Sequence, residues 1–355
     1  PRTTAFMMFH ILHDIREGPY GGGNQFLKSL RDCFRRDGVY EENALGADVV
    51  LFNSHQKLGA ALSLKRKDPG KTFVHRVDGP VSEIRDSHGR IDGVIYRVNR
   101  VLADGTVFQT DWSRERNRSL GMTPTRFETV VMNAPDPRLF HPLEARPFDS
   151  SRRLRLVATS WSSHPNKGFD AYRWMDDHLD FSRFEMTFVG RSPVTFRNIR
   201  MIDPLPSPTL ANRLREQDVF VTASRRDPCS NALIEALHCG LPAVALNDGG
   251  HPEIVGRGGE LFDRPEEIPD RLERIRARYD AYREAIRLPD MDAAAAAYRA
   301  FMTRVREART RGVYEGKPLS PGDWARERGA LFKWTLLRKV EGLGGRWSRL
   351  RGGGP

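Results

Sequence analysis

Two carboxylates bracket the expected start of a helix in the segment from residue 225 to 245. Asp227 comes just before that start and Glu235 lies about one turn inside it, while Gly240 supplies the usual C-terminal stop. A helix that begins at Ser230 or Asn231 presents free backbone N–H groups, which favour an anionic phosphate. A carboxylate can accept two hydroxyl hydrogen bonds at once, from a ribose or another sugar. The segment therefore predicts a site for a nucleotide sugar, although an ordinary strand-loop-helix unit of an α/β protein also fits the pattern.

A second phosphate-binding element is expected near the N-terminus, where Gly21, Gly22 and Gly23 follow a short apolar run and precede a helical pattern. Glycines let the backbone approach a phosphate closely. The spacing differs from the G-x-G-x-x-G dinucleotide fingerprint, which argues against NAD. By itself, the run from Gly18 to Gly23 is also typical of a flexible loop.

Three motifs resemble those of the retaining glycosyltransferases of family 4, which have the GT-B fold. They are Asp227-x7-Glu235 followed by Gly-Leu-Pro, the segment from Val131 to Pro142, and Gly249-Gly-His-Pro-Glu-Ile-Val255. The resemblance implies that Glu235 holds the nucleotide ribose and that Asp227 touches the transferred sugar. Asp227 stands where the family has Glu, so its carboxylate reaches one methylene less far. For the Gly249 segment, a tight turn capped by Glu253 and a contact with the donor are both open.

The resemblance also implies that Lys167 binds the donor phosphates, since it occupies the place of the family's lysine before a glycine. The arginine that the family has five residues earlier is replaced by Ser162. Neighbouring side chains are candidates for its hydrogen bonds, namely Ser160, Ser162, Ser163 and His164. A lysine there would neutralise the departing diphosphate, and a solvated lysine at a helix start is the alternative.

His75 and Asp78 lie at the end of an expected strand, in Val74-His-Arg-Val-Asp-Gly-Pro80. The family often has a histidine here that contacts the donor sugar, and the motif aligns through either residue. Both are therefore candidate catalytic residues, together with Asp227. An Arg76–Asp78 ion pair that shapes the following turn is the structural alternative.

The candidate donor-binding residues come from three segments of the chain. They are Gly22, Gly23, Ser162, Lys167, Cys229, Ser230, Asn231 and Glu235. We expect neither a metal nor another cofactor, because no D-x-D pattern is found outside sequences that read as helix faces or turns.

Length and pattern predict two domains, because 355 residues exceed the usual size of one. Short apolar strands that alternate with helices predict parallel, doubly wound sheets. Strands are expected at 4–12, 48–53, 72–77, 105–110, 129–132, 153–159, 185–189, 199–201, 219–223 and 243–246. We expect an α/β protein of GT-B type, whose two Rossmann-like domains face each other across a cleft. The acceptor-side domain spans 1–148, the nucleotide-sugar-binding domain 149–310, including a closing helix at 293–306, and a basic tail 311–355.

Charge and cysteine usage bear on partners and location. More than half of the net charge of +11 lies from Arg326 onward, and no nucleic-acid-binding module is recognisable. The apolar residues from 331 to 337 do not gather on one helical face, so a solvated or loosely docked tail and contact with an anionic membrane surface are both open. The first residues read as a buried strand and not as a signal peptide. Three cysteines without a C-x-x-C pattern favour a reducing cytoplasm, with the tail allowing peripheral association at the inner membrane face.

These features predict a metal-independent glycosyltransferase that moves a sugar from a nucleotide-sugar donor to an acceptor hydroxyl with retention of anomeric configuration. One alternative is another GT-B enzyme, such as a nucleotide-sugar epimerase or a sugar phosphorylase. The other is a catalytically lapsed protein that still binds nucleotide sugars, since Asp227 and Ser162 depart from the family pattern.

Overall fold

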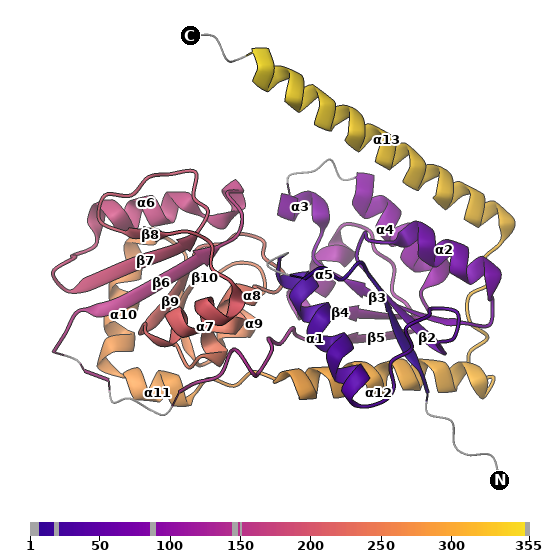
Figure 1. Ribbon diagram of the computed structural model, residues 1–355, viewed down its shortest axis with the longest axis horizontal. Helices are drawn as coiled ribbons and strands as arrows, with labels where there is room; N and C mark the ends of the chain where they lie inside the picture. Colours follow the sequence, from indigo (N-terminus) through magenta and orange to yellow (C-terminus); the bar gives the residue numbers. More distant parts are fainter. Residues whose placement is uncertain (1–6, 18–20, 86–89, 144–147, 150, 352–355) are drawn as a thin grey trace.

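The computed structural model describes residues 7–17, 21–85, 90–143, 148–149 and 151–351. These residues form two α/β lobes that lie side by side, each built on a wholly parallel sheet (Figure 1). Parallel strands alternate with helices throughout both lobes. This confirms the predicted α/β architecture of two doubly wound halves.

The first sheet is wound in two directions from its first strand. Its strands, in spatial order, are β1 (Phe9–Leu12), β2 (Val49–Asn53), β3 (Thr72–Val77), β4 (Gly105–Phe108) and β5 (Phe127–Val130). Tyr40 forms a parallel bridge with Phe9, so the chain runs from β1 through α1 (Gly22–Arg36) to this bridge and only then to β2. The direction of winding reverses between β1 and β2, next to the glycine segment that follows β1. Open α/β sheets bind ligands at such reversals.

The second sheet has six strands in the order β11-β10-β9-β6-β7-β8. They are β6 (Leu154–Ser160), β7 (Phe184–Gly190), β8 (Arg200–Ile202), β9 (Val219–Thr222), β10 (Ala243–Leu246) and β11 (Gly259–Phe262). Here the winding reverses between β6 and β9. Lys167 follows β6 and Asp227 follows β9, so the fold brings the two loops together at the reversal.

Helices cover both faces of each sheet. They include α2 (Leu58–Lys67), α3 (Val81–Arg85), α4 (Arg90–Leu102), α5 (Asp111–Ser119), α6 (Phe169–His178), α7 (Ser207–Arg215), α8 (Asn231–His238), α9 (His251–Val255), α10 (Ile268–Ala277) and α11 (Tyr279–Glu284). Four apolar clusters, two in each lobe, fill the layers between the helices and the sheets. Strands buried on both faces read as continuous apolar runs, which is why the sequence revealed them.

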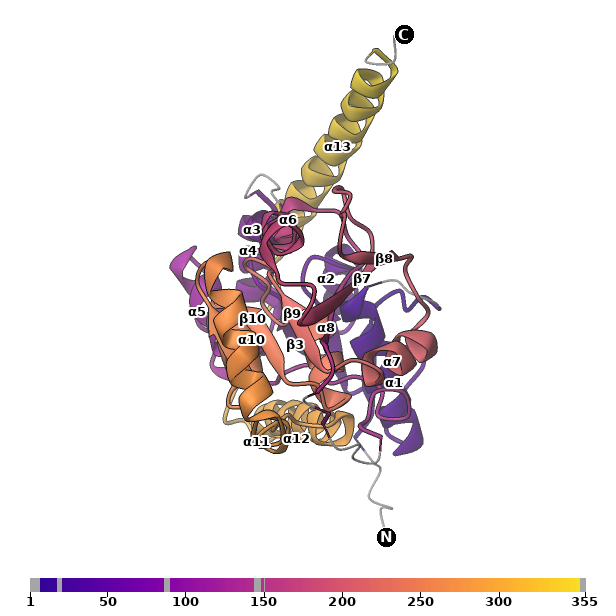
Figure 2. The ribbon, with the colours of Figure 1, turned by 90° about the vertical axis from the view of Figure 1, so that its left-hand side faces the viewer.

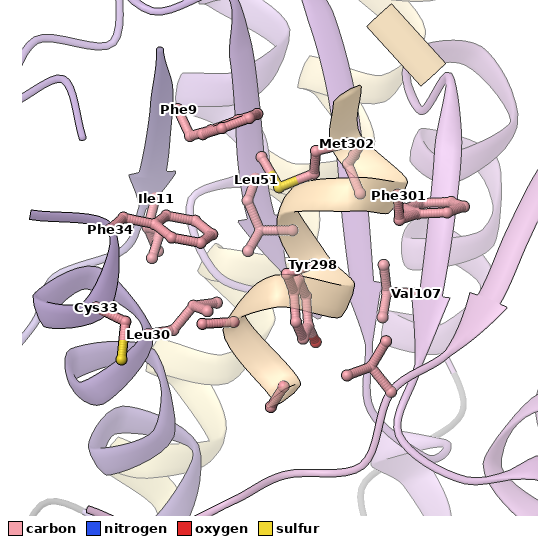
Figure 3. Close-up of a cluster of buried hydrophobic side chains, with 14 of the residues drawn as sticks. Phe9, Ile11, Leu30, Cys33, Phe34, Leu51, Val107, Tyr298, Phe301 and Met302 are labelled. Atoms are coloured by element: carbon pink, nitrogen blue, oxygen red, sulfur yellow. The ribbon is translucent and has the colours of Figure 1, made fainter. Parts of the chain in front are cut away.

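The helix α12 (Met291–Thr310) belongs by its packing to the first lobe, although it follows the second in sequence. Its Tyr298, Phe301 and Met302 lie against the first sheet, near Leu51 and Val107 (Figure 3). The expectation that this helix closes the second half is therefore wrong. Its buried residues recur at helical spacing, which predicts one buried face but does not say which sheet covers it.

The basic tail forms the helix α13 (Pro321–Arg351), which extends beyond the first lobe (Figure 2). Ser320 Oγ accepts a hydrogen bond from Asp323 N and so caps its start. Trp324, Leu331 and Trp334 pack on the cluster beneath α2 and α4. The buried Glu327 accepts a hydrogen bond of 3.0 Å from Arg97 Nε of α4. The tail is thus docked over its first turns.

The ten predicted strands are all present, with ends shifted by a few residues and residues 4–6 lying outside the described part. The long helix α13 and the short elements β11, α3, α9 and α11 were not predicted from the sequence. None of the described helices contains a stretch long and apolar enough to cross a membrane.

Candidate functional site

A cavity of 540 Å³ lies between the two lobes, where loops at the carboxyl ends of both sheets meet. All residues predicted to be catalytic or to bind the donor line it except His75. Those that line it are Gly22, Gly23, Asp78, Ser162, Lys167, Asp227, Cys229, Ser230, Asn231 and Glu235. Of the other hydrogen-bond candidates, Ser160 and His164 line it but Ser163 does not. The fold thus brings together residues from segments more than two hundred positions apart in the sequence.

Lys167 and Asp227 form an ion pair at the reversal of the second sheet, with 3.2 Å between Lys167 Nζ and Asp227 Oδ2. Burial alone would raise the pKa of the Asp227 carboxyl, but the Lys167 ammonium and then the His251 imidazole hold it below its usual value. Its other oxygen accepts a hydrogen bond from Cys229 N. Asp227 is therefore ionised at neutral pH and fixes the lysine at the cavity wall.

Two helix N-termini, one from each lobe, face the same cavity. The first turn of α1 begins at Gly22 and that of α8 at Asn231, and neither contains an acidic residue. The two ends touch so closely that a Cβ on Gly22 would collide with the Asn231 side chain. The first N–H groups of a helix lack acceptors within it, and the helix dipole makes both ends attractive to an anion. The junction is thus suited to a phosphate or diphosphate.

Glu235 lies one turn inside α8, partly exposed in the cavity. Within the described part of the chain, no residue forms an ion pair or a side-chain hydrogen bond with its carboxyl group. Burial raises its pKa to about 8. A carboxyl group in a cleft with no such side-chain partner is suited to accept hydrogen bonds from the hydroxyl groups of a ligand.

The opposite wall of the cavity contains a hydrogen-bonded network, of which only the Arg76–Asp78 ion pair was considered from the sequence. The fully buried Arg76 donates from Nη1 to Asp78 Oδ1 at 2.7 Å and from Nη2 to Asn133 Oδ1 at 2.8 Å. Gln109 also donates to Asp78, and Asn133 donates to Asn231 Oδ1 of the other lobe at 3.2 Å. Asp78 therefore lies in the cavity with one face held by this network, so both the ion pair considered from the sequence and the cavity position are present.

His75 does not face the cavity, so the prediction that it is a cleft residue is wrong. Its ring is buried and stacks on Phe52 with 4.1 Å between centroids. Its Nε2 lies 2.9 Å from the carbonyl oxygen of Ser54, and Asn99 Nδ2 lies 3.2 Å from its Nδ1. Burial lowers its pKa to about 4. These partners make His75 a neutral core residue.

Ser160, at the end of β6, and Ser162 form hydrogen bonds within their own loop. Ser160 Oγ donates to the carbonyl oxygen of Ser162, and Ser162 Oγ accepts from His164 N at 3.1 Å. Cys229 is buried beside Asp227, and burial raises the pKa of its thiol to about 12. Cys229 therefore contributes a neutral wall, and the serines contribute no charge.

Glu253 has a role that neither sequence interpretation foresaw. Its two carboxylate oxygens accept hydrogen bonds from the backbone N–H groups of Asp111 and Trp112, at 2.8 and 2.7 Å, at the start of α5 in the other lobe. Thr110 Oγ1 donates to the carbonyl oxygen of Pro228, the residue after Asp227, at 2.7 Å. Glu253 of the second lobe thus caps helix α5 of the first lobe. Together with the Thr110–Pro228 hydrogen bond, it connects the two lobes.

Several further cavity residues were not predicted, among them His55, Gln109, Trp161 and Arg225. His55 and Gln109 come from loops in which no site residue was predicted, so their positions follow from tertiary folding. Trp161 and Arg225 lie within two residues of the predicted Ser162 and Asp227, and that proximity is the signal that could have found them. Within the described residues, no group of three or more His, Cys, Asp or Glu side chains is arranged to hold a metal ion.

Comparison with known families matches residues 180–277, within the second lobe, to a family model described as glycosyl transferases group 1. Comparison with curated protein sequences gives no significant match.

Solved structures resemble the chain over most of its length. Sucrose-phosphate synthase from Thermosynechococcus elongatus has a TM-score of 0.59 at 13% identity, covering 95% of this chain and 99% of its own. HepE from Anabaena, in complex with UDP-glucose, has a TM-score of 0.60 at 14% identity, covering 86% and 98%. The catalytic domain of starch synthase IV from Arabidopsis thaliana, bound to ADP and acarbose, has a TM-score of 0.58 at 12% identity, covering 81% and 79%. These likenesses show the GT-B fold predicted from the sequence.

Proposed function

We propose that the protein is a glycosyltransferase that moves a sugar from a nucleotide-sugar donor to an acceptor hydroxyl. The observation that carries the proposal is that two helix N-termini from different lobes converge with Lys167 in one cavity, beside Glu235. Among the described residues, the carboxyl group of Glu235 has no side-chain partner. The match to glycosyl transferases group 1 adds support, as do the UDP-glucose and ADP bound in two of the similar structures.

The donor would bind mainly on the second lobe. Its diphosphate would lie beside the junction of the two helix ends, near the amides of Ser230 and Asn231 and those of Gly22 and Gly23, with Lys167 as counter-ion. The ribose hydroxyls would donate to Glu235. This arrangement gives each group of the donor a partner of the chemistry it needs.

The sugar would lie between Asp227 and Asp78, at the junction of the two ion pairs. Asp227 would accept a sugar hydroxyl with a carboxylate already oriented by Lys167. The bond from the anomeric carbon to the phosphate oxygen breaks, and the acceptor oxygen attacks from the same face, which retains the configuration. The acceptor proton passes to the departing phosphate, so that the reaction needs neither a separate base nor a metal.

Location is a further part of the proposal. We expect the protein to act in the cytoplasm, in peripheral contact with an anionic membrane surface through α13. On the outward side of this helix, Phe332 is 72% exposed and Leu336 52% exposed, and Lys333 beside them is exposed too. Apolar side chains flanked by cations are typical of helices that bind anionic lipids.

Co-sedimentation tests this part, with vesicles of phosphatidylglycerol and phosphatidylcholine against vesicles of phosphatidylcholine alone. The double variant Phe332→Ser/Leu336→Ser should lose binding to the anionic vesicles, whereas Val313→Ser, which changes an equally exposed residue outside α13, should retain it. Equal binding by all three proteins would contradict the membrane contact.

The central test is a thermal-shift screen against nucleoside diphosphates and nucleotide sugars without added metal. A ligand at a hundredfold excess over its dissociation constant should add about 2.7 kcal/mol of stability. Glu235→Ala should abolish the shift, and acceptor assays would then use the winning donor. Nucleotide binding without transfer to any acceptor would favour the lapsed binder, a changed sugar without acceptor would favour an epimerase, and no shift at all would contradict the proposal.

A further inference from the structure

Among the described residues, three lysine and arginine side chains line the cavity, and one of them differs from the others in its partner. Lys167 pairs with Asp227 and Arg76 with Asp78, and both of these acids line the cavity as well. Each pair therefore adds little net charge to the site. The third cation is Arg225, which begins the segment that contains Asp227 and Glu235 but was not among the predicted site residues.

Arg225 is anchored beside Lys167 by its backbone. Its N–H donates to the carbonyl oxygen of Asn166, the residue before Lys167, at 2.7 Å. The loops after β6 and β9 thus meet at the point where the winding of the second sheet reverses. A lysine and an arginine enter one cavity from these two adjoining loops.

The guanidinium of Arg225 forms a bidentate pair with Asp170, a residue of the first turn of α6 that does not line the cavity. The distance from Arg225 Nη1 to Asp170 Oδ1 is 2.9 Å, and the two side chains are 43% and 61% exposed. Exposed ion pairs are worth only about 0.2–1 kcal/mol. Exchanging this carboxylate for a phosphate therefore costs little, and the bidentate geometry of an arginine suits either anion.

A diphosphate carries more negative charge than Lys167 alone can neutralise, and the hydroxyls of Ser160 and Ser162 in the neighbouring loop carry no charge. We infer that Arg225 is a second cation for the donor diphosphate, and that Asp170 holds it in the free protein and releases it when the donor binds. This inference rests on the proposed function, since it assigns a partner to the phosphates of the same site.

Isothermal titration tests it with UDP, ADP, GDP and TDP, each compared with its own nucleoside. Arg225→Gln should weaken binding of the preferred diphosphate about tenfold or more, because a charge-assisted hydrogen bond is lost, and leave the nucleoside unaffected. Asp170→Asn should do the opposite and tighten diphosphate binding by about threefold, because it removes the competing carboxylate.

Arg197→Gln is the matched control, since Arg197 forms an exposed pair with Asp177 at the other end of α6. This variant should change neither affinity. A loss of diphosphate affinity in both Arg225→Gln and Asp170→Asn would mean that the pair only supports the loop, and no change in either would exclude Arg225 from the site; both results overturn the inference. Wild-type protein that binds no nucleotide would overturn the proposed function itself, whereas nucleotide binding that Arg225→Gln leaves intact overturns this inference alone.

Discussion

Two ion pairs face each other across the cleft, one from each lobe, and they are built differently. Arg76 is fully buried and donates to Asn53 and Asn133 as well as to Asp78. Lys167 makes one 3.2 Å contact with Asp227, and its side chain is 32% exposed. The arginine is thus held by several partners, whereas the lysine has donors left for a ligand.

The difference indicates a division of labour between the lobes. A buried, multiply bonded pair resists exchange, because removing one partner leaves an uncompensated charge. A partly exposed pair with one contact can reorient toward an incoming phosphate at small cost. We therefore expect the first pair to stabilise the fold and the second to act on the donor, and variants of the two should affect different measurements.

The largest expected effect is on stability. Arg76→Ala should lower the free energy of unfolding by about 3–5 kcal/mol, since it leaves Asp78, Asn53 and Asn133 without their shared donor. Urea denaturation followed by circular dichroism measures this. Lys167→Ala should cost less than about 1 kcal/mol in the same experiment. Equal losses in both variants would remove the distinction between the two pairs.

The next effect is on activity. Lys167→Ala should reduce kcat/KM for the donor, because the leaving diphosphate loses its preorganised cation. The reduction should correspond to about 2.7–4 kcal/mol of lost transition-state stabilisation. Steady-state kinetics with the donor found by thermal shift measures this. Lys67→Ala is the control, since that lysine is exposed on α2 and lies outside the cavity. Activity of Lys167→Ala within twofold of the wild type would refute the role of the second pair.

The sequence revealed the second lobe's side of the site better than the first lobe's. Asp227, Ser230, Asn231 and Glu235 lie in one continuous strand-loop-helix unit, so local spacing alone brings them together. Lys167 was predicted from its resemblance to the family's lysine before a glycine, and the structure places its loop after the strand adjacent to β9, at the winding reversal. Such positions follow from local structure and from the topology of a doubly wound sheet.

The first lobe's side depends on long-range packing and strand alternation. Side chains on a strand point to alternate faces, so two residues three positions apart lie on opposite faces. His75 and Asp78 therefore could not both face the cavity, which alternation along β3 could have indicated. The packing of α12 on the first sheet and the reach of Glu253 across the cleft were not predictable, because nothing local identifies the partner.

The contact between the lobes gives a third, smaller effect. Glu253→Gln should reduce kcat/KM, because it weakens two charge-assisted hydrogen bonds between the lobes at the start of α5 and so favours separation of the lobes. The reduction should correspond to about 2 kcal/mol of lost transition-state stabilisation. Steady-state kinetics and small-angle scattering together measure this. Glu266→Gln changes an exposed carboxylate elsewhere in the second lobe and should have no effect. Reduced activity with an unchanged radius of gyration would assign Glu253 to local capping and not to closure.

The smallest effect is a dependence on pH, and it contrasts the ionisation of the second lobe's two acids, Asp227 and Glu235. Burial raises the pKa of Glu235 to about 8 from an ordinary value of 4.5, whereas the pKa of Asp227 is lowered. The folded state therefore keeps a proton on Glu235 that the unfolded chain loses above pH 4.5. The stability that this neutral group contributes is full below pH 4.5 and is lost as the pH rises through 8.

Ribose hydroxyls bind best to the ionised carboxylate, so nucleoside affinity should rise about tenfold or more between pH 6 and 8 and level off only above about pH 9. Isothermal titration with a nucleoside measures this without interference from phosphate ionisation. Glu235→Gln should remove the pH dependence and should be more stable than the wild type above pH 8, because a neutral amide has no proton to lose. A wild-type affinity that stays constant from pH 6 to 8 would show that Glu235 is already ionised in the free cleft. Glu235 and Asp227 would then differ in side-chain length and not in ionisation.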